Sequence, residues 1–348
     1  MLTLDLQWSH PVSFSVAGNI KPGEVVALLG PSGCGKTTLL HTLAGLQQAQ
    51  GKLTLNDTPL LQQQPEQRPI ALAPQKPVLF PHWTIAEHIK YIGKLSKNQG
   101  GSQQPLFINE LIADLGLEPL LQKHPQQLSG GQQQRASLLL ALLQAPKLLL
   151  LDESFSALDE KSKLPILRAI KKAITPFNSS VIVVSHQLRD CAALAQTAWL
   201  MNDDGIYWQG NIHEGLRHYQ GENPIYSFLK VSFVGNKNNL SQFSLGQQTL
   251  FSAPTNELAP GDKVTVSLNA DDIGISLLPP ESTSFANCLK ARVIKITLED
   301  HDAYILCQLD TNETIQIHIT RHSLDNLNLS TEETIYLVCK AGAVNLIH

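Results

Sequence analysis

The fold of this chain is decided by one stretch, Gly30-Pro31-Ser32-Gly33-Cys34-Gly35-Lys36-Thr37, which satisfies the pattern G-x-x-x-x-G-K-[ST]. A continuous apolar run over residues 25–29 precedes it and predicts a buried strand, and residues 37–46 predict a helix. In such a strand–loop–helix unit, backbone N–H groups converge on a phosphate and the helix points its positive dipole end at it. We therefore expect Lys36 to neutralise the β- and γ-phosphates of a nucleotide and the Thr37 hydroxyl to bind Mg²⁺.

Acidic residues end a second apolar run, Lys147-Leu148-Leu149-Leu150-Leu151-Asp152-Glu153. Four consecutive leucines predict a strand buried on both faces, so both carboxylates emerge at its carboxyl end, beside the phosphate loop. Asp152 is then placed to hold Mg²⁺ through water, and Glu153 to accept a proton from the water that attacks the γ-phosphorus. Acidic residues at a strand end are also common caps, and it is the phosphate loop that favours the catalytic interpretation.

Strands alternate with helices around these motifs. Residues 181–184 are another buried-strand candidate, and residues 136–143 and 162–174 have helical periodicity. This order predicts an α/β fold, a P-loop NTPase core with a mainly parallel sheet. Alternating apolar residues at 2–6 and 12–16 predict the half-exposed strands of an antiparallel β subdomain.

Residues 76–135 differ from their surroundings because they contain helical pieces, at 85–95 and 107–115, but no strong strand. We expect an inserted helical subdomain, with a flexible loop at 96–105 where Gln, Gly and Ser accumulate. The first domain is expected to span residues 1–222.

The remaining residues, 225–348, change to short strands with turn residues, which predicts a C-terminal all-β domain. A faint repeat relates Phe228-Leu229-Lys230-Val231 to Cys288-Leu289-Lys290-Ala291, and residues 263–268 to residues 334–339. Two tandem lobes, 225–283 and 284–348, would explain this repeat. A single irregular β-domain is the alternative.

Bulk properties exclude several classes of protein. The formal net charge is −4, divided into +1 up to residue 222 and −5 after it, so no basic field predicts a nucleic-acid partner. The five cysteines are scattered without a C-x-x-C pair, which favours reduced thiols over disulfides or zinc. We find no secretory signal, and residues 138–151 are too interrupted to cross a bilayer, so any membrane association is expected through another protein.

The motifs resemble, in identity and order, those of the nucleotide-binding subunits of ABC transporters, over about residues 1–222. They are residues 30–37, Gln75, Leu128-Ser129-Gly130-Gly131-Gln132, residues 148–153, Ser156-Ala157-Leu158-Asp159 and His186. The resemblance implies a homodimer with two ATP molecules. Each ATP is held between the phosphate loop of one copy and residues 128–132, here called the Ser129 segment, of the other copy. Physical reasoning agrees, because Ser129 and the N–H groups of Gly130 and Gly131 form a second anion site at a helix start. In isolation such a segment is more often a plain helix cap.

The resemblance also implies individual roles. Gln75 contacts Mg²⁺ or the attacking water, His186 bonds the γ-phosphate, and Trp8 stacks under the adenine, with plain packing as the alternative for Trp8. The implied ATP contacts are Trp8, Gly30, Pro31, Ser32, Gly33, Cys34, Gly35, Lys36, Thr37, Thr38, Ser129, Gly130, Gly131, Gln132 and Asp159, with Glu153, His186 and Gln75 catalytic and Thr37, Gln75 and Asp152 on the metal.

Two departures from the family pattern stand next to these residues. Ser154 follows Glu153 where proline is usual, which predicts a less rigid turn. Ala73-Pro74 precede Gln75 where an apolar-aromatic pair is common. Neither departure removes a catalytic group.

The tail resembles the oligosaccharide-binding-like, TOBE-type β-domains of bacterial importer ATPases. Residues 283–289 resemble most the segment that opens the oxyanion-binding lobe in molybdate importers. Ala286 stands where that segment usually carries arginine, which would remove a charge-assisted donor. Ferric-iron, sulfate, polyamine and sugar importers carry related tails and Leu79-Phe80-Pro81-His82, so they stay open as alternatives.

Together these features predict the ATPase subunit of an importer at the cytoplasmic face of a bacterial inner membrane. Its expected partners are a second copy, a separate permease received near residues 80–91, and indirectly a periplasmic solute-binding protein. Rival interpretations are a non-transport regulatory ABC ATPase, including one that works on nucleic acid or the ribosome, and a solute sensor in which the tail is the working part.

Overall fold

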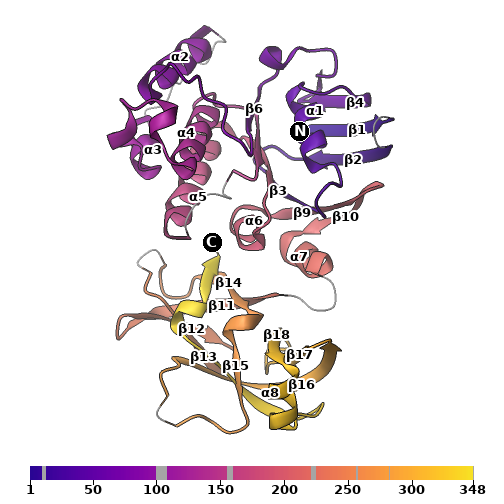
Figure 1. Ribbon diagram of the computed structural model, residues 1–348, viewed down its shortest axis with the longest axis vertical. Helices are drawn as coiled ribbons and strands as arrows, with labels where there is room; N and C mark the ends of the chain where they lie inside the picture. The colour runs from indigo at the N-terminus through magenta and orange to yellow at the C-terminus, as the bar shows by residue number, and fades with distance from the viewer. Residues whose placement is uncertain are drawn as a thin grey trace. The chain divides into compact units, whose positions relative to one another are not determined.

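The computed structural model describes residues 1–9, 13–98, 108–154, 160–220, 225–255, 258–281 and 283–347. The chain divides into two compact units, residues 1–219 and residues 220–348, which Figure 1 shows in indigo to salmon and in salmon to yellow. None of the helices in these described ranges has the length and apolar character that crossing a bilayer requires.

A single ten-stranded sheet forms the frame of the first unit, in the order β5-β4-β1-β2-β10-β9-β3-β8-β7-β6. Strands β9, β3, β8, β7 and β6 run parallel, whereas β1 pairs antiparallel with both β2 and β4. The parallel core and the antiparallel part are therefore two halves of one sheet. Its strands are β1 (Leu2–Trp8), β2 (Phe14–Ile20), β3 (Val25–Leu29), β4 (Gln50–Leu55), β5 (Thr58–Pro59), β6 (Ile70–Ala73), β7 (Leu148–Asp152), β8 (Ser180–Val184), β9 (Thr197–Asn202) and β10 (Gly205–Asn211).

Every residue of β3, β7 and β8 is buried, which explains their continuous apolar sequences, since a parallel strand is covered on both faces. Other fully buried side chains in the same apolar core are Trp199 of β9 and the leucines of α1. Strand β1 instead alternates buried and exposed residues, as an antiparallel strand with one solvated face does.

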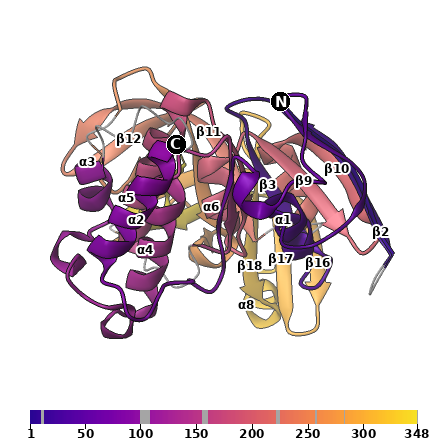
Figure 2. The ribbon, with the colours of Figure 1, turned by 90° about the horizontal axis from the view of Figure 1, so that it is seen from above.

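The helices separate into two groups. Figures 1 and 2 both show α2, α3, α4 and α5 together on one side and α1 beside the antiparallel strands. The helices are α1 (Lys36–Ala44), α2 (Ile85–Asn98), α3 (Ile108–Asp114), α4 (Gly130–Leu142), α5 (Glu160–Ile174), α6 (Leu188–Leu194) and α7 (Ile212–Gln220). Helix α2 reaches Asn98, into the predicted loop at 96–105, and residues 99–107 lie outside the described part of the chain.

The second unit consists of two five-stranded antiparallel sheets around one apolar core, in the orders β13-β12-β11-β14-β20 and β15-β19-β16-β17-β18. Its elements are β11 (Tyr226–Lys237), β12 (Leu240–Leu245), β13 (Gln248–Ser252), β14 (Lys263–Asn269), β15 (Gly274–Ser276), β16 (Asn287–Glu299), β17 (Asp302–Gln308), β18 (Thr314–Thr320), α8 (Arg321–Leu327), β19 (Thr334–Cys339) and β20 (Asn345–Ile347).

The sequence repeat in this unit corresponds to equivalent strand pairs. Strand β11 pairs with β14, joining Leu229 to Val266, and β16 pairs with β19, joining Leu289 to Leu337. The final short strands are exchanged, because β15 pairs with β19 of the second sheet and β20 pairs with β14 of the first. Each sheet thus takes an edge strand from the half of the tail that supplies the other sheet.

Candidate functional site

Four loops meet at one edge of the first sheet because β3, β8, β7 and β6 are parallel neighbours. The phosphate loop follows β3, His186 follows β8, Glu153 follows β7 and Gln75 follows β6. Ligands of open α/β sheets bind at this carboxyl edge, outside the strand ends. The topology therefore brings together residues separated by up to 156 positions (30 to 186) in the sequence.

The phosphate loop is closed around its own lysine. Lys36 Nζ donates to the carbonyls of Gly30 at 2.8 Å and Pro31 at 2.7 Å, and contacts Cys34 Sγ at 3.8 Å. Gly35 caps α1 with φ of +96°, a backbone conformation that favours glycine. The lysine is thus already held at the loop, where a bound phosphate would compete with these carbonyls for its ammonium group.

Asp152 is the last residue of β7 and is almost completely buried, with 3% of its surface exposed. Burial raises the pKa of its carboxyl group, and a hydrogen bond from the Thr37 hydroxyl opposes that shift. Two of the three predicted metal-binding side chains, Asp152 and Thr37, are therefore in direct contact at the end of the strand.

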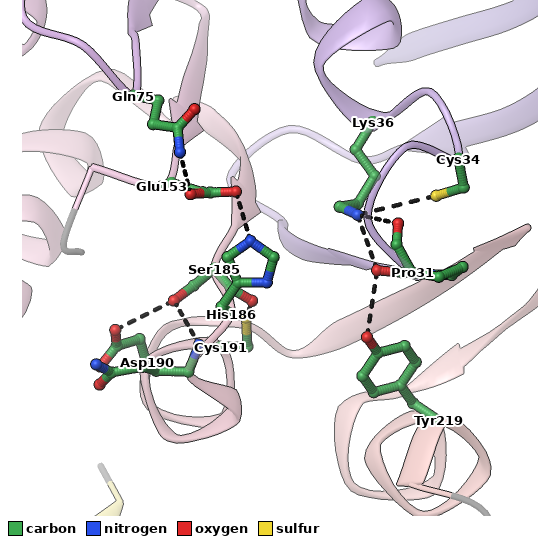
Figure 3. Close-up of polar contacts among 12 residues, drawn as sticks. Pro31, Cys34, Lys36, Gln75, Glu153, Ser185, His186, Asp190, Cys191 and Tyr219 are labelled. Atoms are coloured by element: carbon green, nitrogen blue, oxygen red, sulfur yellow. Dashed lines mark hydrogen bonds and ion pairs between the residues drawn. The ribbon is translucent and has the colours of Figure 1, made fainter.

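The three predicted catalytic side chains form a continuous chain of contacts, drawn in Figure 3. Gln75 Nε2 donates to Glu153 Oε2 at 2.5 Å, and His186 Nε2 lies 2.8 Å from Glu153 Oε1. Glu153 adopts φ of +48°, and its backbone N–H donates to Val184 O at 2.9 Å. The carboxylate is consequently held between two polar partners at the open edge of the sheet, with the His186 side chain 58% exposed.

The Ser129 segment is the N-terminus of α4, six residues earlier than the helical periodicity predicts. Ser129 Oγ accepts from the Gln132 backbone at 3.3 Å and the Gln132 side chain accepts from the Ser129 N–H at 3.0 Å, forming a capping box. The motif predicts this helix start correctly, whereas the apolar periodicity alone begins only after the three polar glutamines at residues 132–134. Ser129 and Gly130 are exposed, and Gly131 is half-buried.

Trp8 lies at the end of β1 inside the core. Its ring stacks on Phe14, with centroids 4.3 Å apart, and its indole N–H donates to Thr42 Oγ1 at 3.1 Å. It also lines a cavity of about 390 Å³ together with Gln50 and Asp204. The described contacts are those of packing, and adenine stacking by Trp8 stays a prediction. Asp159 and residues 155–158 lie outside the described residues.

The two departures from the family pattern meet in space. Ser154 is 2% exposed, and its hydroxyl donates to the carbonyl of Ala73, 2.8 Å away at the end of β6. This bond ties the strand before Gln75 to the residue after Glu153. The less rigid turn expected at Ser154 is therefore cross-linked by its own side chain.

Sequence reasoning missed other polar contacts at the site. The Tyr219 hydroxyl, on α7, donates to the Gly30 carbonyl at 3.2 Å, so this carbonyl is shared with Lys36. Gln134 Nε2, on α4, contacts the Gln75 carbonyl at 3.4 Å, linking the Gln75 loop to the helix that Ser129 begins. No local pattern marks either residue, because each acts on a loop distant in sequence.

A cavity of about 630 Å³ extends from this edge towards the helical group. Its lining includes Thr37, Gln75 and Asp152 of the site and Phe80, His88 and Tyr91 of the helical subdomain. Its outer rim carries exposed apolar side chains, with Val78 81% and Phe80 50% exposed. In the described part of the chain, no group of three His, Cys, Asp or Glu side chains is placed to hold a metal by itself.

Known proteins resemble this chain over nearly its full length. Residues 14–156 match the ABC transporter family and residues 283–346 match the TOBE domain. The molybdenum import ATP-binding protein ModC of Hahella chejuensis is 32% identical over 337 residues, covering 93% of each chain. The protein of the same name from Pseudomonas savastanoi pv. phaseolicola is 32% identical over 340 residues, again with 93% coverage of both.

Solved structures share the fold of the first unit. An ATP-binding subunit of an ABC transporter superposes with a TM-score of 0.54 and 22% identity, covering 61% of this chain and 90% of that one. A dimeric ATP-binding cassette in a post-hydrolysis state, bound to ADP and Pi, gives a TM-score of 0.51 and 23% identity, covering 61% and 99%. From its sequence relatives, the chain belongs to the ABC transporter family, as an ATP-binding ATPase subunit that carries a C-terminal TOBE domain.

Proposed function

We propose that this chain hydrolyses ATP at the carboxyl edge of its first sheet and thereby drives solute import through a separate permease. The observation that carries the proposal is the chain of contacts Gln75–Glu153–His186 beside the buried Asp152. It joins a proton acceptor to two polar groups that can hold water and phosphate, next to a phosphate loop.

Asp152 and Thr37 fit a magnesium ion. A carboxylate that is almost fully buried is unfavourable without a cation, and its raised pKa reflects that cost. Mg²⁺ usually takes only one or two protein ligands and fills its remaining positions with water and phosphate oxygens, which suits a site with few protein ligands. When bound, the ion would neutralise charge on the β- and γ-phosphates.

Glu153 serves as the general base in this proposal. Gln75 and His186 contact the two carboxylate oxygens and orient the group, and the exposed His186 ring is free to bond the γ-phosphate of a bound nucleotide. Lys36 exchanges the carbonyls of Gly30 and Pro31 for phosphate oxygens, which are stronger acceptors.

The Ser129 segment supplies the second half of the site, from a second copy of the chain. Its exposed helix start presents backbone N–H groups and a positive dipole end, which attract an anion. A head-to-tail homodimer with two ATP molecules satisfies both segments at once, and the similar cassette solved as a dimer supports this arrangement. Asp159 and Trp8 are proposed ATP-site residues on family resemblance.

The transported solute is proposed to be a molybdenum oxyanion, because relatives that match over 93% of this chain are named molybdenum import proteins. The tail gives this choice less support, since Ala286 lacks the usual arginine and Asn287 is buried and bonded to the Phe251 backbone. Ferric iron, sulfate, a polyamine or a sugar are the alternative solutes.

The apolar rim around Val78, Phe80 and Tyr91 is the proposed contact for cytoplasmic helices of the permease. These side chains are exposed, and they lie on the wall of the cavity that begins at Gln75. Docking there would place the subunit at the cytoplasmic face of the membrane, with a periplasmic solute-binding protein as an indirect partner.

The experiment that tests hydrolysis compares Glu153→Gln with Lys36→Ala. Glu153→Gln keeps the size and one oxygen acceptor of the side chain but removes the base. It should therefore bind ATP and form a stable dimer with ATP and Mg²⁺ while turnover falls about 10²- to 10⁴-fold. Lys36→Ala should lose ATP affinity itself. Binding is measured with a fluorescent ATP analogue, dimerisation by light scattering and turnover by phosphate release.

The outcomes separate the parts of the proposal. Hydrolysis at the native rate by Glu153→Gln would show that Glu153 is not the base. A strictly monomeric Glu153→Gln protein with ATP and Mg²⁺ would contradict the shared site. Absence of any ATPase activity in the unmodified protein would instead favour a solute sensor.

A further inference from the structure

A buried ion pair lies directly behind the loop that carries His186. Lys163 on α5 and Asp190 on α6 are 3% and 4% exposed, and Lys163 Nζ lies 3.5 Å from Asp190 Oδ2. Neither residue belongs to a motif of the sequence analysis. Two charges removed from water in this way must have partners that compensate the loss of hydration.

The partners of this pair include the two residues that flank His186. Ser185 Oγ donates to Asp190 Oδ2 at 3.2 Å, and Lys163 Nζ donates to the Gln187 side-chain carbonyl. Figure 3 shows Ser185 next to His186, with its hydroxyl bonded to Asp190 on the side away from the ring.

The backbone of the same loop is held as well. The Gln187 N–H donates to Ser185 Oγ at 3.0 Å, and the Asp190 N–H donates to the Gln187 carbonyl at 3.0 Å. The loop is thus fixed on both sides of the one residue whose side chain points away from the network, His186.

The fixed backbone of this loop matters because the His186 side chain is exposed and yet makes a short contact with Glu153. His186 Nε2 lies 2.8 Å from Glu153 Oε1, whereas 58% of the side chain faces solvent. An exposed imidazole keeps such a position only if its backbone is fixed, since a shift of about 1 Å is enough to lose much of a positioned interaction. Fixing by buried, mutually bonded groups is the usual way to obtain that accuracy.

We propose that Lys163 and Asp190 are positioning residues for ATP hydrolysis, which hold His186 against Glu153 through Ser185 and Gln187. The inference rests on the proposed function. The pair also joins α5, which follows the segment containing Asp159, to the loop of His186. A displacement of α5 would therefore also move the loop that carries His186.

The test uses Asp190→Asn, Ser185→Ala and the double variant Lys163→Met/Asp190→Leu in the full chain. Asp190→Asn and Ser185→Ala should lower kcat, roughly tenfold and fivefold, with ATP affinity changed less than twofold. The double variant replaces both charges by apolar groups, so it should recover native thermal stability while kcat stays low. Lys172→Met is the matched control, because Lys172 lies on the same helix in an exposed ion pair with Glu110 and should keep native kcat.

A second readout follows His186 itself. In protein with labelled histidines, the imidazole resonance that His186→Ala removes should shift in Asp190→Asn and in Ser185→Ala but not in Lys172→Met. Native kcat in the double variant, or an unchanged His186 resonance where kcat falls, would show that the pair only supports folding. Ser185→Ala, a mild substitution, decides the matter if Asp190→Asn does not fold. If the unmodified protein hydrolyses ATP and these variants match it, the inference fails while the proposed function stands.

Discussion

Replacing Ser154 by alanine tests whether its hydroxyl connects the Gln75 loop to the Glu153 loop. Ser154 and Ala73 are 2% and 1% exposed, and the bond between them is 2.8 Å long. Loss of one buried hydrogen bond costs about 1 kcal/mol, or more where the remaining carbonyl finds no other donor. For a unit of this size that corresponds to a fall in Tm of about 2–4 °C. If the same 1 kcal/mol is lost in the transition state, kcat falls about fivefold.

Ser179→Ala is the matched control for this prediction. Ser179 is also 2% exposed, and its hydroxyl donates to a backbone carbonyl, that of Pro146, at 2.5 Å. The bond between Ser179 and Pro146 lies at the ends of β7 and β8 opposite to the site. Loss of this bond should therefore lower Tm by a similar amount and leave kcat unchanged. Differential scanning calorimetry and phosphate release measure the two quantities. Equal kcat in Ser154→Ala and the native protein, or an equal loss of kcat in both variants, would refute the connection.

Two further predictions concern other contacts of the structure. Tyr219→Phe removes a donor to the Gly30 carbonyl, so the Kd for ATP should rise about fivefold in a fluorescence titration. The control Tyr207→Phe, at an exposed tyrosine, should leave the Kd unchanged. Equal Kd values for the two variants would exclude a role of Tyr219 in ATP binding. In the tail, a hydrogen bond to Asp271 raises the pKa of His318. This contact therefore stabilises the fold fully at pH values below the ordinary histidine pKa of about 6.5, and the stabilisation is lost as the pH rises through the raised pKa. The Tm of the tail should fall over that range, and Asp271→Asn should flatten the dependence; a slope that Asp271→Asn leaves unchanged would contradict it.

The parallel core could be predicted from the sequence because its strands are short, continuous apolar runs. The runs at residues 25–29, 148–151 and 181–184 correspond to β3, β7 and β8 within one residue at each end. Strand β6 could not be predicted in the same way. Its four residues, Ile70-Ala71-Leu72-Ala73, are too few and too small to give a period, although β6 delivers Gln75 to the site.

The site itself could be predicted as far as its motifs reach. Family resemblance identifies Gln75, Glu153 and His186 as candidates, and the structure adds that Glu153 contacts both of the others. The residues that hold them in place carry no motif in the sequence. Ser154 and Asp190 act on loops that are neighbours only after the sheet has formed, and neither alters local periodicity. Such contacts depend on the three-dimensional arrangement of strands, which no short pattern encodes.

The exchange of β15 and β20 makes the two halves of the tail inseparable. A protein cut near residue 283 would leave β14 without its outer neighbour in one fragment and β19 without its outer neighbour in the other. Unpaired backbone N–H and C=O groups along these strands can pair with strands of other chains and cause aggregation. A gene rearrangement could therefore append or delete this tail only whole, and a recombinant half-tail would be expected to precipitate.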